Sequence, residues 1–126
     1  MPDLHEVGPA GLDDLDSEDA TLVALARSAQ ARTGAVAAAA VREDTGRSYV
    51  AAAVELAALR LSALDAAVAA AVSSGARVLE AAALVTEGAV PTAGELAALV
   101  ELSRPGTRLI VAGPDGVVRA LLRLGE

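Results

Sequence analysis

LRLSALDAAVAAAVSSGA, residues 59–76, contains a helix start, an apolar body and a helix stop. Ser62 can accept a hydrogen bond from a main-chain N–H of the first turn, and with Asp65 it approximates a capping box. Gly75 suits the residue that ends a helix, because glycine adopts a left-handed conformation without strain. We therefore predict a helix over residues 62–74. Nearly all of its side chains are methyl-sized, which suits both a buried core helix and close packing between subunits.

The composition limits the kind of core that the chain can build. Its 126 residues are enough for one domain, and 54% of them are hydrophobic, yet it has one Tyr and no Phe or Trp. The core must therefore consist of Ala, Val and Leu, and each such side chain buries little area. Because burial between subunits adds stability to a small domain, we expect the chain to self-associate.

Cysteine content and charge exclude several kinds of function. The chain has no Cys, which removes disulfides, thiolate nucleophiles and sulfur metal ligands and favours a cytoplasmic location. Its formal net charge is −7, with ten Arg and no Lys, so a nucleic-acid backbone would be repelled at long range. The longest charge-free run, residues 66–76, is too short to span a membrane. We predict neither nucleic-acid nor membrane binding.

Acidic residues are concentrated at the N-terminus. Seven of the seventeen Asp and Glu residues lie within the first nineteen positions. We predict that residues 1–16 form a flexible acidic leader and that residues 17–126 form the folded domain. The alternative is that the leader docks on a small basic strip made by Arg119 and Arg123. His5, the only histidine, lies in the leader and is expected to be exposed, so it supplies no base for a nucleophile such as Ser62.

The remaining elements follow from caps, turns and periodicity. Ser17, followed by acids at positions 18 and 19, predicts a helix over residues 17–32. Turn residues between two apolar runs predict a β-hairpin with strands at 35–41 and 48–54. Further along we predict a strand at 78–86, a helix at 92–102, a strand at 107–113 and a final strand or helix. Because Ala is a good helix former and a poor strand former, a helical bundle is the alternative.

Several motifs in this order resemble the small cytidine deaminase family over about residues 17–124. They are Gly46-Arg47-Ser48-Tyr49 leading to Val54-Glu55, then Ser62-Ala63-Leu64-Asp65, then Pro91-Thr92-Ala93-Gly94-Glu95, and finally Val111 to Gly116. The resemblance implies an α/β fold of three layers, α/β/α, around a mixed five-stranded sheet. It also implies a homo-oligomer, either a dimer or a tetramer.

The resemblance further implies a zinc site that this chain does not retain. In the family, a Cys or His on the second helix and two Cys on the third hold Zn²⁺, and a nearby Glu carries protons. Here Ser62, Thr92 and Glu95 stand at the ligand positions, and Leu64 stands at the proton-carrying position. Two neutral hydroxyls and one carboxylate do not form a zinc site, so we predict no cofactor. Thr92 and Glu95 instead match a capping box.

The family's substrate contacts are also reduced. Ala53 and Ala35 stand where the resemblance implies a ribose-binding Asn and a base-stacking Phe, and only Glu55 is kept. Glu55 is either a retained sugar contact or a strand-end carboxylate that binds local N–H groups. One carboxylate is a weak basis for nucleoside affinity.

Three functional hypotheses follow. The leading one is a catalytically inactive, zinc-free cytidine deaminase-like protein that acts as a homo-oligomeric structural or interaction module, with a protein partner that the sequence does not identify. The alternative is binding of a nucleoside or related metabolite without turnover. A second alternative is residual cytidine deaminase (hydrolase) activity.

Overall fold

A computed structural model describes residues 4–6 and 15–125, and its largest element is a mixed β-sheet. The strands follow the order β1-β8-β7-β6-β2-β3, and β6 and β7 are parallel while the other neighbouring pairs are antiparallel. The strands are β1 (Leu4–Glu6), β2 (Ala37–Glu43), β3 (Ser48–Ala52), β6 (Leu79–Thr86), β7 (Ser103–Ala112) and β8 (Val118–Leu124). The five predicted strands therefore form one mixed sheet, and the short β1 extends its β8 edge.

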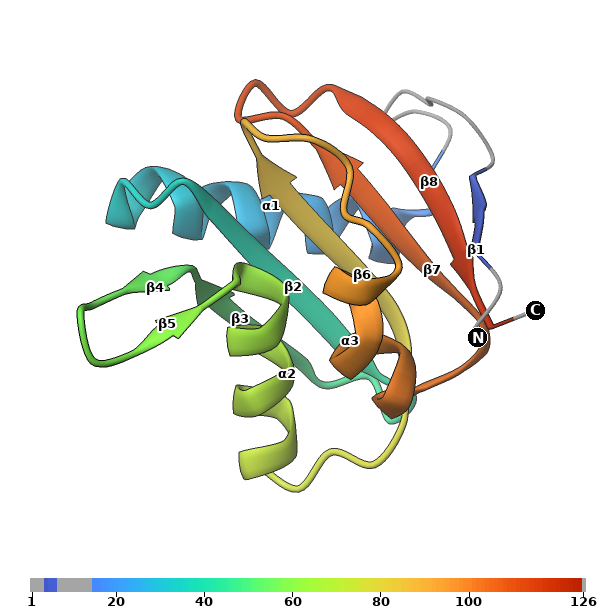
Figure 1. Cartoon of the computed structure of the whole chain (residues 1–126). Coiled ribbons are helices and arrows are strands. Elements are labelled where there is room, and N and C mark those ends of the chain that lie inside the picture. Colours follow the sequence, from blue (N-terminus) through green and yellow to red (C-terminus); the bar gives the residue numbers. More distant parts are fainter. Residues whose placement is uncertain (1–3, 7–14, 126) are drawn as a thin grey trace.

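Helices cover both faces of the sheet (Figure 1). Helix α1 (Ser17–Thr33) lies on one face, while α2 (Ala63–Ser73) and α3 (Ala97–Leu102) lie on the other. A short two-stranded sheet made of β4 (Val54–Glu55) and β5 (Arg60–Leu61) projects from the body between β3 and α2. The predicted α/β architecture with three layers is thus confirmed.

The side chains of β2 alternate between the two hydrophobic clusters on opposite faces of the sheet. Ala39 and Val41 join the cluster under α2 and α3, whereas Ala40 joins the cluster under α1. Successive side chains of a strand point to opposite faces, so an uninterrupted run of small apolar residues is buried on both sides. Because β2 pairs with β3 through a turn at Gly46, whose φ is 98°, the helical-bundle alternative is wrong.

Several boundaries differ from the predictions. The predicted helix over 92–102 begins as the 3₁₀ helix η2 (Gly94–Leu96) before α3 starts. Strand β7 begins at Ser103 rather than 107, so Pro105 and Gly106, which lie between the predicted helix and the predicted strand, are inside the strand. The final segment is a strand and not a helix. The strands β4 and β5, each only two residues long, were not predicted as separate strands.

The leader contributes a strand that was not predicted. Residues Leu4–Glu6 pair antiparallel with β8, and His5 lies opposite Arg123 in the register. This part of the leader is docked on the sheet, which corrects the expectation of a free arm for these three residues. Residues 1–3 and 7–14 lie outside the described residues, so their predicted flexibility stays a prediction.

A buried ion-pair cluster fixes α1 to the sheet. Asp19, only 2% exposed, accepts hydrogen bonds from Arg42 Nη2 at 3.0 Å and Arg108 Nε at 2.8 Å. Arg42 Nε donates to Glu80 Oε2 at 2.6 Å, and Arg104 contacts the other oxygen of Glu80 at 3.3 Å. We call Asp19, Arg42, Glu80, Arg104 and Arg108 the ion-pair cluster.

Arg42 and Arg108 of this cluster have pKa values raised above the ordinary value of arginine. Burial lowers the pKa of Arg42, but hydrogen bonds to Glu80 and Asp19 outweigh burial and raise it above its ordinary value. The hydrogen bond to Asp19 likewise raises the pKa of Arg108. Both groups therefore remain charged wherever the protein is folded under ordinary conditions.

Candidate functional site

A pocket of about 700 Å³ opens between the start of α2, the β4–β5 hairpin and the loop that follows β6. Its size falls in the range of roughly 300–1,000 Å³ that is typical of small-molecule sites. The lining residues are Val36, Ala37, Ala53, Val54, Glu55, Arg60, Leu61, Ser62, Ala63, Leu64, Leu84, Thr86, Gly88, Ala89, Val90, Pro91, Thr92 and Glu95.

The pocket brings together most of the residues singled out from the sequence. Those that line it are Ala53, Glu55, Ser62, Leu64, Thr92 and Glu95. Ala35 is not among the lining residues, and its carbonyl accepts a hydrogen bond from Gln30 Nε2 at 3.0 Å. The exposed side chain of Val36 stands at that part of the wall instead.

Ser62 caps the N-terminus of α2. Its side-chain oxygen accepts a hydrogen bond from the main-chain N–H of Asp65 at 3.1 Å, and its own backbone is extended. The predicted cap is confirmed, although the described residues show only the serine half of the capping box. The Ser62 oxygen is thereby oriented toward the helix end.

Thr92 and Glu95 form the full capping box that the sequence predicts. The Glu95 N–H donates to Thr92 Oγ1 at 3.4 Å, and Glu95 Oε1 accepts from the Thr92 N–H at 3.2 Å. The Thr92 hydroxyl also donates to Glu95 Oε1 at 3.0 Å. The polar atoms of both side chains are therefore used in hydrogen bonds at the start of η2.

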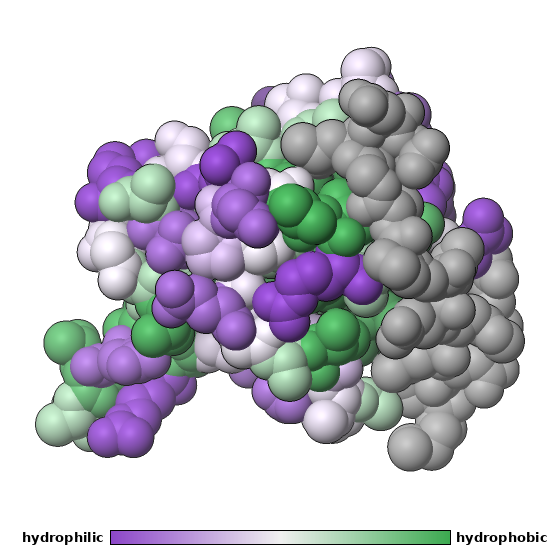
Figure 2. Space-filling model, turned by 90° about the horizontal axis from the view of Figure 1, so that it is seen from above, coloured by the Kyte–Doolittle hydropathy of each residue, from purple (hydrophilic) through white to green (hydrophobic). Residues whose placement is uncertain are grey.

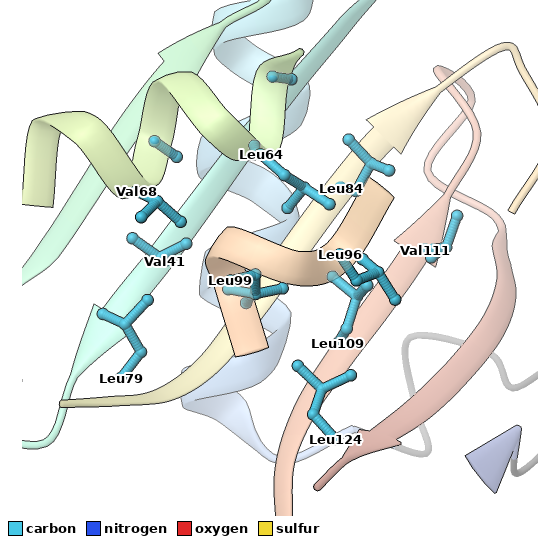
Figure 3. Packing of buried hydrophobic residues seen from close by; sticks show 14 of the residues in the cluster. Val41, Leu64, Val68, Leu79, Leu84, Leu96, Leu99, Leu109, Val111 and Leu124 are labelled. Atoms are coloured by element: carbon cyan, nitrogen blue, oxygen red, sulfur yellow. The ribbon is translucent and has the colours of Figure 1, made fainter. Parts of the chain in front are cut away.

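Leu64 makes the inner wall of the pocket apolar. It is 3% exposed and points from α2 toward Leu84 of β6, above Leu96 (Figure 3). An aliphatic side chain can neither give nor accept a proton, so this position offers packing and no acid–base chemistry.

The donor atoms at the positions implied for zinc do not fit a zinc ion. Zinc sites use deprotonated Cys, neutral His and carboxylate ligands, usually three or four together. Glu95 is the only such group here, and its Oε1 accepts two hydrogen bonds from Thr92, while the Ser62 oxygen is used in a cap. The described part of the chain also contains no cluster of three or more His, Cys, Asp or Glu residues suited to a metal.

The β4–β5 hairpin supplies a charged part of the pocket and an apolar surface outside it. Main-chain bonds between Leu56 and Leu59 close the hairpin at 2.9 and 3.3 Å. Glu55 and Arg60 are directly opposite each other, and alternation places Leu56 and Leu59 on the other side of the hairpin. Within the described residues Glu55 makes no hydrogen bond, so the local N–H contacts considered for it are not formed.

A second arginine fixes the opposite wall. Arg119 of β8 donates to the carbonyl oxygens of Thr86, at 3.0 Å, and Gly88, and so holds the loop that lines the pocket after β6. Arg60 and Val36, which line the pocket, and Arg119, which holds its loop, were not connected with the pocket from the sequence. The alternation of apolar and charged residues around Ala57-Ala58 was the one local signal for the hairpin, whereas the contacts of Arg119 span more than thirty residues.

Comparisons with known proteins agree on one family. The family model described as "Cytidine deaminase-like" matches residues 15–116. The structure is similar to a cytidine deaminase from Burkholderia pseudomallei, with a TM-score of 0.68 and 24% identity over 79% of this chain and 88% of that chain. It is also similar to one from Mycobacterium leprae, with a TM-score of 0.63 and 23% identity over 85% and 94% of the two chains.

A third similar structure is the cytidine deaminase from Mycobacterium tuberculosis, with a TM-score of 0.59 and 28% identity over 84% of this chain and 91% of that one. No curated protein matches the sequence. None of the helices within residues 15–125 has the length and apolar content that crossing a bilayer requires.

Proposed function

The chain belongs to the cytidine deaminase-like family, and we propose that within this family it is a catalytically inactive, zinc-free protein that acts as a homo-oligomeric structural or interaction module. The observation that carries the proposal is the use of Ser62, Thr92 and Glu95 as helix caps in the pocket where the resemblance implies zinc ligands. Leu64 adds an apolar wall where the resemblance implies a proton carrier.

Metal analysis together with a turnover assay tests this proposal. The purified chain, incubated with zinc and desalted, should carry far less than one zinc per chain and form no uridine from cytidine. The matched control is the variant Ser62→Cys, Leu64→Glu, Thr92→Cys and Glu95→Cys, which supplies three thiolates and a carboxylate and should retain zinc. Stoichiometric zinc or uridine formation in the unchanged chain would establish residual deaminase activity and overturn the proposal.

The proposed oligomer is supported by the outer surface of the hairpin. Leu56 and Leu59 are 60% and 48% exposed, and the hairpin protrudes from the body in two views (Figures 1 and 2). A two-stranded hairpin is only marginally stable in water unless its apolar side is covered. Val50 of β3 and Val72 of α2 add exposed apolar groups on neighbouring elements.

Light scattering tests the hairpin as a contact between subunits. The unchanged chain should be a dimer or tetramer, and the double variant Leu56→Asp, Leu59→Asp should dissociate while its circular dichroism is unchanged. Val117→Asp is the matched control, since Val117 is 59% exposed and lies on the turn before β8. A monomeric unchanged chain would contradict the oligomer itself.

A second candidate function is binding of a nucleoside or related metabolite without turnover. The open pocket and the unpartnered carboxylate of Glu55 favour it. A thermal-shift measurement with millimolar cytidine and uridine tests this candidate, because a ligand that binds only the folded state raises the melting temperature.

We also propose that the protein is cytoplasmic and that it binds a protein partner and not nucleic acid. A chain without Cys fits the cytoplasm, and a net charge of −7 argues against nucleic acid as a partner. A protein partner bound by the oligomer is compatible with the exposed apolar side of the hairpin. Co-purification of the tagged chain from a cytoplasmic extract, compared with the Leu56→Asp, Leu59→Asp variant, would test whether that side is used.

A further inference from the structure

The pocket wall carries two opposite charges whose side chains have no partner among residues 4–6 and 15–125. Glu55 and Arg60 are both exposed, both line the pocket and lie directly opposite each other on β4 and β5. Neither makes a hydrogen bond or ion pair with another residue in the part of the chain that the structure describes. By contrast, Arg42 and Arg119 are held by Glu80 and by main-chain carbonyls. The hairpin charges are therefore available to a ligand.

The spacing of these charges matches a small zwitterion. Residues directly opposite each other in an antiparallel pair have Cβ atoms about 4.5–5.5 Å apart. Arg60 can bind a carboxylate through two parallel N–H groups, and Glu55 can accept hydrogen bonds from an ammonium group. A molecule with both groups on one carbon can reach both side chains at once.

The inner wall of the same pocket is apolar. Leu64 and Leu84 are 3% and 6% exposed, and Val90 lines the pocket from the loop after β6. Among the polar side chains that line the pocket, Thr86 already accepts a hydrogen bond from the Gly88 N–H at 3.0 Å. Apart from the hairpin charges, the others, Ser62, Thr92 and Glu95, are used in hydrogen bonds at helix starts. A ligand should therefore place an apolar group against this wall.

We propose that the pocket binds a zwitterionic small molecule with an ammonium and a carboxylate group at one end and an apolar body at the other, such as an apolar α-amino acid. The carboxylate binds Arg60, the ammonium binds Glu55, and the apolar body packs against Leu64 and Leu84. This inference rests on the premise, shared with the second candidate function, that the pocket is open in solution.

A pyrimidine nucleoside fits this inner wall less well. The base carries polar groups along its edge, and an aliphatic wall leaves those groups without hydrogen-bond partners. An apolar side chain has no polar group to leave unpaired, and its burial against this wall favours binding. The chemistry of the wall thus favours the amino acid over the nucleoside.

Isothermal titration with the full chain tests the proposal. L-Leucine and L-phenylalanine should bind, and glycine should bind at least about tenfold more weakly because it lacks the apolar body. N-Acetyl-leucine lacks the ammonium charge and leucinamide lacks the carboxylate, so each should lose at least about tenfold in affinity. Cytidine should not bind measurably.

Single substitutions test which group of the ligand each pocket charge binds. Arg60→Gln should abolish the preference for leucine over leucinamide, and Glu55→Gln should abolish the preference for leucine over N-acetyl-leucine. Arg77→Gln is the control, because Arg77 is exposed and does not line the pocket. A merely structural effect would weaken all ligands equally and leave these ratios unchanged, which would overturn the assignment.

The outcomes separate this inference from the proposed function. Binding of cytidine without binding of leucine would overturn the inference and support the second candidate function. Binding of neither would overturn the inference and leave the inactive module standing. Uridine formation, measured separately, would overturn the proposed lack of catalysis and say nothing in favour of amino-acid binding.

Discussion

The two faces of the sheet use charge in opposite ways. Under α1, the buried Asp19 bridges Arg42 and Arg108, and Arg42 in turn contacts Glu80. On the opposite face, Glu55 and Arg60 are exposed and have no partner within the described residues. Charges that are paired and buried hold one arrangement of the chain, whereas free charges beside a pocket can act on something outside it. The difference separates the charges that stabilise the fold from the charges that are available for function.

The largest effect should come from Asp19→Ala. Loss of this carboxylate leaves two guanidinium groups without their shared acceptor, so the free energy of unfolding should fall by about 3–5 kcal/mol. Urea denaturation measures the change. Glu18→Ala is the matched control, because the Glu18 side chain is 73% exposed and 3.8 Å from Arg42, and it should change stability by less than about 0.5 kcal/mol. Equal losses in both variants would contradict a special role for the buried bridge.

The loss of unfolding free energy caused by Asp19→Ala should not depend on pH near neutrality. The pKa values of Arg42 and Arg108 are raised in the folded state, so their contribution is fully present below the ordinary arginine pKa. This contribution to stability is lost only as the pH rises through the folded-state pKa values of the two arginines. Denaturation at about pH 6 and about pH 9 should therefore give the same difference in unfolding free energy, since both pH values lie below the pKa values of the two guanidinium groups.

The next largest effect should come from the apolar wall of the pocket. Leu64→Ala should lower the free energy of unfolding by about 2–5 kcal/mol, because it removes buried contacts and leaves a cavity beside Leu84. Leu64→Met conserves volume and should cost less than about 1.5 kcal/mol. If both variants were as stable as the unchanged chain, Leu64 would belong to an open cavity and not to the core.

A smaller effect should come from the capping box. Thr92→Ala removes the acceptor for the Glu95 N–H and should cost about 1 kcal/mol, measured by urea denaturation. Thr92→Ser keeps the hydroxyl and should restore most of that loss. A Thr92→Ala variant of unchanged stability would show that the hydrogen bonds at η2 contribute nothing net.

The smallest effect on stability should come from the free pocket charges. Glu55→Gln should change the free energy of unfolding by less than about 0.5 kcal/mol, because an exposed side chain without a partner contributes little. Thermal denaturation checks this, with Asp19→Asn as the paired buried counterpart. A large loss at Glu55 would remove the contrast between the two faces.

Local signals made most of the elements and two helix caps predictable, but not the cap of α1, which is Asp16 and not Ser17. Ser62 and the Thr92–Glu95 pair were identified as caps because a cap depends on residues three positions apart. The Ala-rich hairpin was identified from its turn and from the family resemblance, against the propensity of Ala. Its burial on both faces explains why propensity alone would have failed there.

Long-range contacts were not predictable in the same way. Asp19 was interpreted as an acid in the first helical turn, yet its partner Arg108 lies 89 residues away and no local pattern marks the pair. Strands β4 and β5 are only two residues long, and the alternation of apolar and charged residues around them was not interpreted as a hairpin, so Arg60 was not recognised as a neighbour of Glu55. The pocket depends on both kinds of contact, which is why its members were found only in part.

The caps also oppose the introduction of a zinc site by single substitutions. A single replacement of Ser62 or Thr92 by a thiol removes a hydroxyl that now holds a helix end, and a carboxylate at position 64 would sit in an apolar wall. Each step lowers stability on its own, and no metal is gained until the whole set is in place. Single substitutions toward a zinc site therefore cost stability without the compensation that a bound metal would give.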